Sequence, residues 1–244
     1  MARTPARDRR GRVRELAYRV SPVRSALENG SARRVAALTF DDGPDPVFTP
    51  RVLDVLAQHR AQATFFVVGK RAARHPELVR RIVAEGHAIG SHSFSHLDAG
   101  MLSWRELLRD YRAGRRAVEQ VLGSRVRLFR PPKGHYSGRS AIAVRLAGMR
   151  PWLWTIDSED WRPGVTAGEL LGRTEALAAG DVVLLHDAME LPLAPEAEDR
   201  SATVAALPRL IDAVRQRGLE CVSLAEPPTR YGGRAGSNAP GIPR

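Results

Sequence analysis

Two adjacent carboxylates, Asp41 and Asp42, follow the apolar run 35–40 and precede a Gly-Pro turn. Neighbouring carboxylates stay ionised together only beside a cation or strong hydrogen-bond donors. His92 and His96 supply two imidazoles four residues apart, which puts both rings on one side of a helical turn or a tight loop. One carboxylate and two imidazoles are typical of a catalytic divalent metal site. We expect Asp42, His92 and His96 to bind such an ion; the alternative is a turn-forming Asp-Gly pair and two surface histidines.

Asp41 is then expected beside the ion as a general base. A bound metal lowers the pKa of its water toward ~7, and a nearby carboxylate can take the proton as that water attacks a carbonyl carbon. The alternatives are that Asp41 is a second ligand or a cap. Arg130 precedes a rigid Pro-Pro pair, so its guanidinium can hold Asp41 ionised and oriented. An exposed arginine near a turn is the alternative for Arg130.

His186 ends the apolar run 182–185 and is the candidate general acid. It can protonate a leaving amine if a carboxylate holds it cationic and oriented. Asp160 is the candidate partner, and Asp187 is the alternative. Beside them, Trp161 and Leu184 can form an apolar wall for a small acyl group, or can simply pack in the core.

The elements that position these residues alternate between strand-like and helix-like stretches from residue 35 onward, which predicts an α/β fold with parallel strands. The predicted strands are 35–40, 63–68, 87–91, 127–129, 151–156, 182–186 and 220–223. The predicted helices are 49–60, 70–85, 103–122, 138–148, 166–179 and 203–217. The candidate residues all follow the ends of strands, and in a closed parallel barrel those ends meet on one face. The sequence therefore predicts a single barrel with one composite site.

The net charge of +11 is concentrated at the two ends of the chain. Residues 1–34 hold ten arginines and three acids, and residues 227–244 hold three arginines and no acid. We expect a basic, disordered arm over 1–34, the catalytic barrel over 35–226, and a disordered basic tail over 227–244. Because no basic face with interleaved aromatic residues is present, no specific nucleic-acid partner is expected.

The single cysteine, Cys221, rules out an internal disulfide framework and a zinc site built from cysteines. No run of 18 apolar residues is present, so no membrane span is expected. The positively charged N-terminus lacks the apolar core of a signal peptide, which favours a cytoplasmic location while leaving export by another route open. The sequence leaves the oligomeric state unknown.

Five ordered segments resemble the motifs of the polysaccharide deacetylases, carbohydrate esterase family four. They are Thr39-Phe40-Asp41-Asp42-Gly43-Pro44, His92-Ser93-Phe94-Ser95-His96, Arg130-Pro131-Pro132-Lys133-Gly134, Asp157-Ser158-Glu159-Asp160-Trp161 and Leu184-Leu185-His186. The resemblance covers about residues 35–225, and five motifs in order are far more specific than any one alone.

The resemblance implies a distorted (β/α)7 barrel and metal-dependent removal of acetyl groups from acetylated sugars. It assigns the base to Asp41 and the metal to Asp42, His92 and His96, with zinc the most common ion and cobalt or manganese also used. It further implies that Arg130 positions the base, that Asp160 is the partner of the acid His186, and that Trp161 and Leu184 form the acetyl pocket.

One position departs from the family pattern. Lys133 stands after Pro132 where an aromatic residue is usual. The resemblance implies that the backbone N–H at this position helps to bind an oxyanion, which a lysine can still provide, and we expect Pro132, Lys133 and Gly134 to belong to the substrate pocket. The lysine adds a cation near the site. Whether the substrate is a polymer, as is usual in this family, is therefore left open. The acidic, proline-rich loop 190–199 follows the predicted strand 182–186 on the active face and can shape the pocket for the rest of the substrate.

We therefore expect a hydrolase that deacetylates an N-acetylated sugar, in an oligosaccharide, a polysaccharide or a sugar-containing metabolite. One alternative is an amide hydrolase of the same fold that acts on a small metabolite. Others are a catalytically idle sugar-binding module and a binder of nucleic acid or anionic surfaces through the basic arm. Acetate release from a panel of substrates distinguishes the enzymes, and truncation of residues 1–34 tests the arm.

Overall fold

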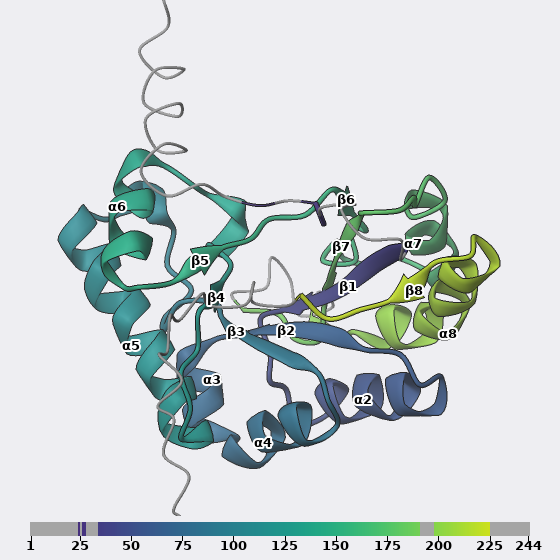
Figure 1. Cartoon of the computed structure of the whole chain (residues 1–244), viewed down its shortest axis with the longest axis horizontal. Helices are drawn as coiled ribbons and strands as arrows, with labels where there is room; N and C mark the ends of the chain where they lie inside the picture. The colour runs from purple at the N-terminus through teal and green to yellow at the C-terminus, as the bar shows by residue number, and fades with distance from the viewer. Residues whose placement is uncertain (1–23, 25, 28–33, 191–197, 225–244) are drawn as a thin grey trace, which may run out of the picture.

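A computed structural model of the chain describes residues 24, 26–27, 34–190 and 198–224 (Figure 1). Its strands are β1 (Val35–Asp41), β2 (Ala63–Val67), β3 (Ala88–Ser91), β4 (Leu128–Phe129), β5 (Arg150–Pro151), β6 (Ile156–Asp157), β7 (Val182–His186) and β8 (Glu220–Cys221). Its helices are α2 (Phe48–Gln58), α3 (Gly69–Arg74), α4 (Pro76–Ala84), α5 (Trp104–Leu122), α6 (Gly138–Leu146), α7 (Ala167–Arg173) and α8 (Ser201–Gln216), with short 3-10 turns η1 (Ala99–Met101) and η2 (Pro132–Gly134).

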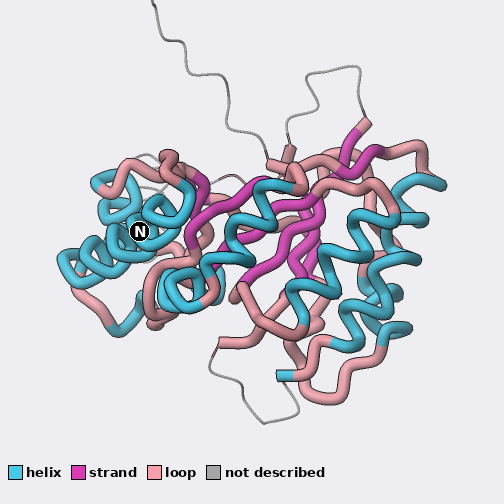
Figure 2. The backbone as a smooth tube through the Cα atoms, turned by 90° about the horizontal axis from the view of Figure 1, so that it is seen from below, coloured by secondary structure: helices cyan, strands magenta, loops and turns pink. Residues whose placement is uncertain are grey.

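The strands form one sheet in the order β5-β4-β3-β2-β1-β7-β6, with β8 paired to β1, and every pairing is parallel. The sheet curls, and the helices lie outside the strands (Figure 2). This arrangement is the predicted barrel with an opening in its wall. Among the described residues no strand pairing joins β5 to β6. Beside that opening, the backbone of Arg24 forms an isolated parallel β-bridge with Trp152, and the Leu27 N–H donates to the Gly180 carbonyl at 2.8 Å.

The side chains of β1 alternate between two environments, as expected for a strand. Leu38 and Phe40 belong to the main hydrophobic cluster, which also contains buried residues of α2, α4 and α8. Ala37 belongs to a smaller cluster with residues of β2, β4 and β7, which only the concave side of the sheet can bring together. Thr39 and Asp41 lie two and four residues after Ala37, so their side chains point to the same side of the strand as that of Ala37. They therefore face the interior of the barrel, where the candidate site lies.

Three predicted elements differ from the observed ones. The predicted helix 70–85 is two helices, α3 and α4, because Pro76 has no N–H to donate and restricts His75 before it. The predicted strand 151–156 is the two short strands β5 and β6, which lie at opposite ends of the strand order. The predicted helix 166–179 ends at Arg173. By contrast, the predicted helix 103–122 is present as α5, and a capping box of Ser103 and Glu106 stands at its start.

Most of the predicted basic arm, 1–34, and the whole predicted tail, 227–244, lie outside the described residues, as does most of the loop 190–199. No helix among the described residues is long and apolar enough to cross a membrane.

Candidate active site and metal centre

Asp42, His92 and His96 come together in a buried group, each offering one ligand atom within 4.8 Å of the others. Asp42 Oδ1 lies 3.4 Å from His92 Nε2 and 3.1 Å from His96 Nε2. Two of the other polar atoms are engaged: Asp42 Oδ2 accepts the Glu190 N–H at 2.9 Å, and His92 Nδ1 bonds the Arg130 carbonyl at 2.8 Å. His96 Nδ1 is buried and has no hydrogen-bond partner among the described residues. Asp42 Oδ1 has no other hydrogen-bond partner among the described residues. These donors fit a divalent ion, because a carboxylate oxygen and two imidazole nitrogens converge while outer contacts fix their orientation.

Electrostatics favour the ionised form of Asp42. Burial alone raises a carboxyl pKa, but the bonds to His92 and His96 outweigh it and hold the pKa of Asp42 well below its ordinary value. A ligand carboxylate must be deprotonated to bind a metal, so the site is prepared for a cation over the physiological pH range.

Unusual backbone geometry brings these ligands to the cavity. In a strand, Asp41 and Asp42 would point to opposite faces, but Asp42 has φ 71°, which turns its side chain toward the cavity that Asp41 also faces. Ser93 and His96 have φ 65° and 53°, in the left-handed region that non-glycine residues seldom adopt. Such strain concentrates at functional sites and needs surrounding support.

The support for the histidine loop comes from α5. Asp110 accepts the N–H groups of Phe94 and Ser95 at 3.2 and 3.1 Å. Gly114 lets the loop approach closely, since a Cβ there would stand 2.4 Å from the Ser93 carbonyl carbon. Neither Asp110 nor Gly114 was predicted, because their contact with the loop exists only once α5 packs against it.

The predicted pairing of Asp41 with Arg130 is present. Arg130 is fully buried, and its Nη1 donates to Asp41 Oδ1 at 2.9 Å and to Thr39 Oγ1 at 2.7 Å. Its Nη2 donates to the Leu153 carbonyl at 2.9 Å, and the guanidinium lies 4.3 Å from the ring centre of Phe66. Burial lowers the pKa of Arg130 against the opposing effect of Asp41, but arginine remains charged. Arg130 therefore fixes one carboxylate oxygen, while Asp41 Oδ2 lies 3.7 Å from His92 Nε2.

Asp160 is the partner of His186, as predicted, and the alternative Asp187 is not. His186 Nδ1 lies 2.6 Å from Asp160 Oδ1, and Asp160 Oδ2 accepts the His186 backbone N–H at 2.8 Å. Burial lowers the pKa of His186, but the Asp160 carboxylate outweighs burial and raises it to about 9. The Thr203 hydroxyl also donates to Asp160 Oδ2, and Arg200 Nη1 donates to the Asp160 carbonyl. His186 is therefore cationic at neutral pH, with Nε2 free to face the cavity.

A cavity of about 370 Å³ joins the metal group to His186. Of the predicted pocket residues, Trp161, Leu184 and Lys133 line it. Lys133 is half exposed and its Nζ lies 3.9 Å from Asp98 Oδ2, so it brings the cation expected at the rim.

Pro132 and Gly134 form the η2 turn but do not contribute to the cavity lining among the described residues. Gly134 packs against Trp154, because a Cβ on it would meet the indole at 2.7 Å. Trp154 and Met189 also line the cavity and lie outside the predicted motifs. Asp157, the first residue of the fourth motif, and Glu190, the first residue of the loop 190–199, line it as well.

Glu190 links the metal group to the outer part of the barrel. Its backbone N–H holds Asp42 Oδ2, and its buried carboxylate pairs with Arg71 Nε at 2.9 Å and with the Lys70 ammonium. Arg71 also donates through Nη2 to the Met189 carbonyl at 2.8 Å. These contacts hold the backbone after β7 in the position from which the Glu190 N–H reaches Asp42.

The model of one protein family, described as polysaccharide deacetylase, matches residues 28–152. A peptidoglycan-N-acetylglucosamine deacetylase of Bacillus cereus is 39% identical over 197 residues, which cover 79% of this chain and 87% of the relative. A chitooligosaccharide deacetylase of Sinorhizobium fredii is 39% identical over 209 residues, covering 84% of this chain and 96% of the relative. Among solved structures, a family 4 carbohydrate esterase from Streptomyces lividans in complex with acetate is 28% identical with a TM-score of 0.70, over 80% of this chain and 95% of that one.

Proposed function

Because the chain belongs to the polysaccharide deacetylase family, carbohydrate esterase family 4, it is a hydrolase of N-acetylated sugars, and we propose that its sugar is N-acetylglucosamine in peptidoglycan or chitooligosaccharide. One observation carries the proposal: Asp42, His92 and His96 form a buried ligand group that opens into the same cavity as Asp41 and His186. No short segment of chain could assemble these groups by chance, since they come from the ends of three strands.

Asp42, His92 and His96 hold a divalent ion, for which zinc suits a site of two imidazoles and one carboxylate best, with cobalt and manganese as alternatives. When bound, the ion supplies Lewis acidity, which makes a water more acidic and polarises the acetyl carbonyl. The ligands' outer contacts, Glu190 N–H to Asp42 and the Arg130 carbonyl to His92, orient them for this role.

Asp41 accepts a proton from the attacking water as the water oxygen bonds to the acetyl carbon. Arg130 keeps Asp41 ionised and directs its second oxygen toward the cavity. His186, held cationic by Asp160, donates its Nε2 proton to the departing nitrogen as the carbon–nitrogen bond breaks. A backbone N–H of the turn at Lys133 supports the oxyanion, and Trp161 and Leu184 enclose the methyl group. The products are acetate and a free sugar amine.

Asp41→Asn tests the assignment of the base. The variant retains the metal group but loses proton acceptance, so acetate release should fall on the order of 10²–10⁴-fold. Zinc binding, measured by calorimetry, should remain. Asp212→Asn, an exposed site on α8, is the matched control and should release acetate at the wild-type rate. Unchanged turnover in Asp41→Asn would refute the role.

A substrate panel tests the sugar. Acetate release from chitooligosaccharides and from peptidoglycan should exceed release from small N-acetyl compounds. A preference for the small compounds would favour the alternative, an amide hydrolase that acts on a metabolite. Reconstitution of metal-free protein with zinc, cobalt or manganese then identifies the ion that supports the highest rate.

A further inference from the structure

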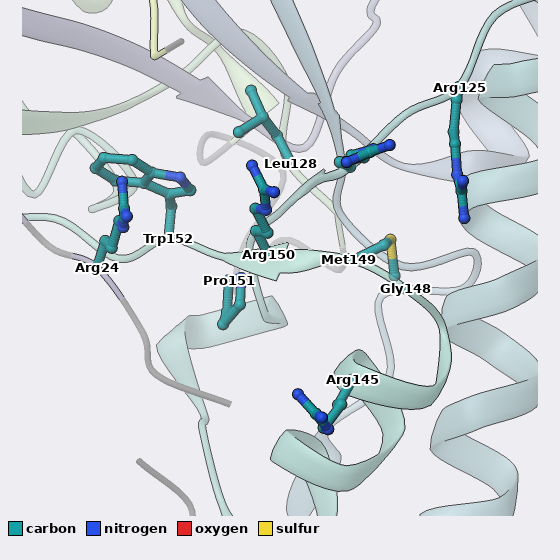
Figure 3. Close-up of a pocket in the computed structure, with 10 residues that line it drawn as sticks. Arg24, Arg125, Leu128, Arg145, Gly148, Met149, Arg150, Pro151 and Trp152 are labelled. Atoms are coloured by element: carbon teal, nitrogen blue, oxygen red, sulfur yellow. The ribbon is translucent and has the colours of Figure 1, made fainter. Parts of the chain in front are cut away.

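A second cavity, of about 430 Å³, lies at the amino ends of β4 and β5 (Figure 3). Five arginines and a tryptophan dominate its lining: Arg24, Arg125, Arg127, Arg145, Arg150 and Trp152. We call it the arginine cavity. The catalytic groups follow the carboxyl ends of the strands, as Arg130 follows β4, so the arginine cavity lies at the opposite end of the barrel. It shares no lining residue with the catalytic cavity in the described part of the chain.

The charge of the arginine cavity is one-sided. Five guanidinium groups line it, and no carboxylate does among the residues that the structure describes. This is not a consequence of overall composition, because residues 35–226 hold 25 basic and 24 acidic side chains. Arg125, Arg145 and Arg150 form no ion pair among the described residues, so a multiply charged anion placed in the cavity would offset the repulsion between their charges.

The cavity is built on rigid elements. Arg150 begins β5, where it pairs in register with Leu128 and its N–H donates to the Arg127 carbonyl at 2.6 Å. Arg24 is tied to the edge of β5 by its bridge to Trp152, and its guanidinium lies 5.8 Å from the centre of that indole. Backbone pairing therefore sets the places of three of the arginines before any ligand arrives, which lowers the entropic cost of binding.

The Arg150 side chain contributes a buried donor to the cavity. Nη1 of Arg150 is buried and has no hydrogen-bond partner among the described residues. Figure 3 shows this side chain rising from β5 between Trp152 and Met149, with Arg145 below it and Arg125 to its right. A buried donor without a partner is unfavourable, and an oxyanion in the cavity would accept its hydrogen bond.

We propose that the arginine cavity binds the phosphate group of a small soluble ligand. Guanidinium forks match the oxygens and the double charge of phosphate, whereas a single carboxylate would occupy only one fork. The volume of the cavity falls in the range of small-molecule sites, and its concave shape favours such a ligand over a flat lipid surface. The ligand would not enter the catalytic cavity, since the two cavities share no lining residue in the part of the chain that the structure describes.

Calorimetry on the full-length protein tests the proposal, with inorganic phosphate and pyrophosphate as probes. Pyrophosphate should bind saturably and more tightly than phosphate. Arg150→Gln should weaken its binding at least tenfold, as expected for the loss of a charge-assisted hydrogen bond. Arg145→Gln should also weaken pyrophosphate binding, and it should leave the fold intact because Arg145 is exposed. Arg150→Lys keeps the charge but loses the guanidinium fork. Its affinity for pyrophosphate should lie between those of the wild type and Arg150→Gln.

Arg116→Gln is the matched control, because it removes the same charge from an exposed position on α5 outside the cavity. It should bind pyrophosphate like the wild type, and all variants should release acetate normally. Absence of saturable binding at about 10 mM pyrophosphate, weaker than any functional small-ligand affinity, would overturn the proposal. So would an equal loss in Arg116→Gln. Binding confined to anionic phospholipid vesicles, with soluble phosphates inert, would overturn the soluble ligand and point to a membrane surface instead.

Discussion

Asp160→Asn should convert His186 from a cationic acid into a neutral imidazole. Burial opposes the charged ring, and the Asp160 carboxylate is the largest of the effects that raise its pKa to about 9 from an ordinary 6.5, with smaller contributions from Asp42 and Asp41. Without the Asp160 carboxylate, the pKa should fall toward 6.5. A fall of about 2.5 pH units corresponds to roughly 3 kcal/mol, at about 1.4 kcal/mol for each pKa unit.

The substituted amide also changes the hydrogen-bonding pattern. Asp160 Oδ2 accepts from the His186 backbone and from Thr203, so the single oxygen of Asn should occupy that position. Its NH₂ group then faces His186 Nδ1 and makes that nitrogen an acceptor. The proton moves to Nε2 of a neutral ring, which is a much weaker acid than the imidazolium.

NMR titration of the metal-free protein, with ¹⁵N-labelled histidine, measures the change directly. The seven histidines are few enough to assign. Asp212→Asn is the control, because it removes a carboxylate 3.7 Å from His59 and should leave His186 unchanged. Acetate release should decline above the lower pKa in Asp160→Asn and should be affected most at alkaline pH. A His186 titration within half a unit of the wild type would refute the reasoning.

Two further predictions concern the groups around this centre. Glu190→Ala removes the ion pairs with Arg71 and Lys70 that hold the Glu190 N–H on Asp42. It should therefore weaken zinc binding roughly tenfold, as measured by competition with a chelator. Glu175→Ala, at an exposed position, is the control and should bind zinc like the wild type. Asp187→Asn should stabilise the metal-free protein at pH 8 but not at pH 4 in urea unfolding. Burial raises the pKa of Asp187 to about 7 from 3.8, so the folded state binds more protons than the unfolded state and loses stability as the pH rises between those values, by up to about 4 kcal/mol. Equal midpoints at pH 8 would contradict this.

The predicted site residues that the structure brings together are those that follow strands directly. Asp41 and His186 lie opposite each other in the β1–β7 register, so the end of each strand brings its polar residue to one place. Asp42, His92 and His96 gather because the parallel strands β1 and β3 end at the same face. Parallel pairing fixes this neighbourhood, and a pattern of apolar runs is enough to predict it. The comparisons confirm the family and the distorted barrel that the five motifs indicated.

The residues that sequence reasoning missed act through contacts between distant segments. Thr39 is one polar residue within an apolar strand, and only packing shows that Arg130 donates to it. Trp154 lies outside the predicted motifs, yet it lines the catalytic cavity, because the predicted strand 151–156 breaks there. Glu190 begins the loop that was expected to shape the pocket, but only the folded chain shows that its backbone N–H donates to Asp42. The extents of the arm and tail, the cytoplasmic location and the identity of the ion stay predictions.

The difference between Asp41 and Asp42 follows from the end of β1. Two successive residues of a strand face opposite sides, so neighbouring carboxylates could not both serve one cavity if β1 continued through them. The strand ends at Asp41, and Asp42 turns into the left-handed region at φ 71°, which brings both carboxylates to the interior. Arg130 then binds Asp41, and the backbone of Glu190 binds Asp42, so each carboxylate has its own cationic or polar partner. Identical side chains thus acquire different roles from a single change in backbone direction.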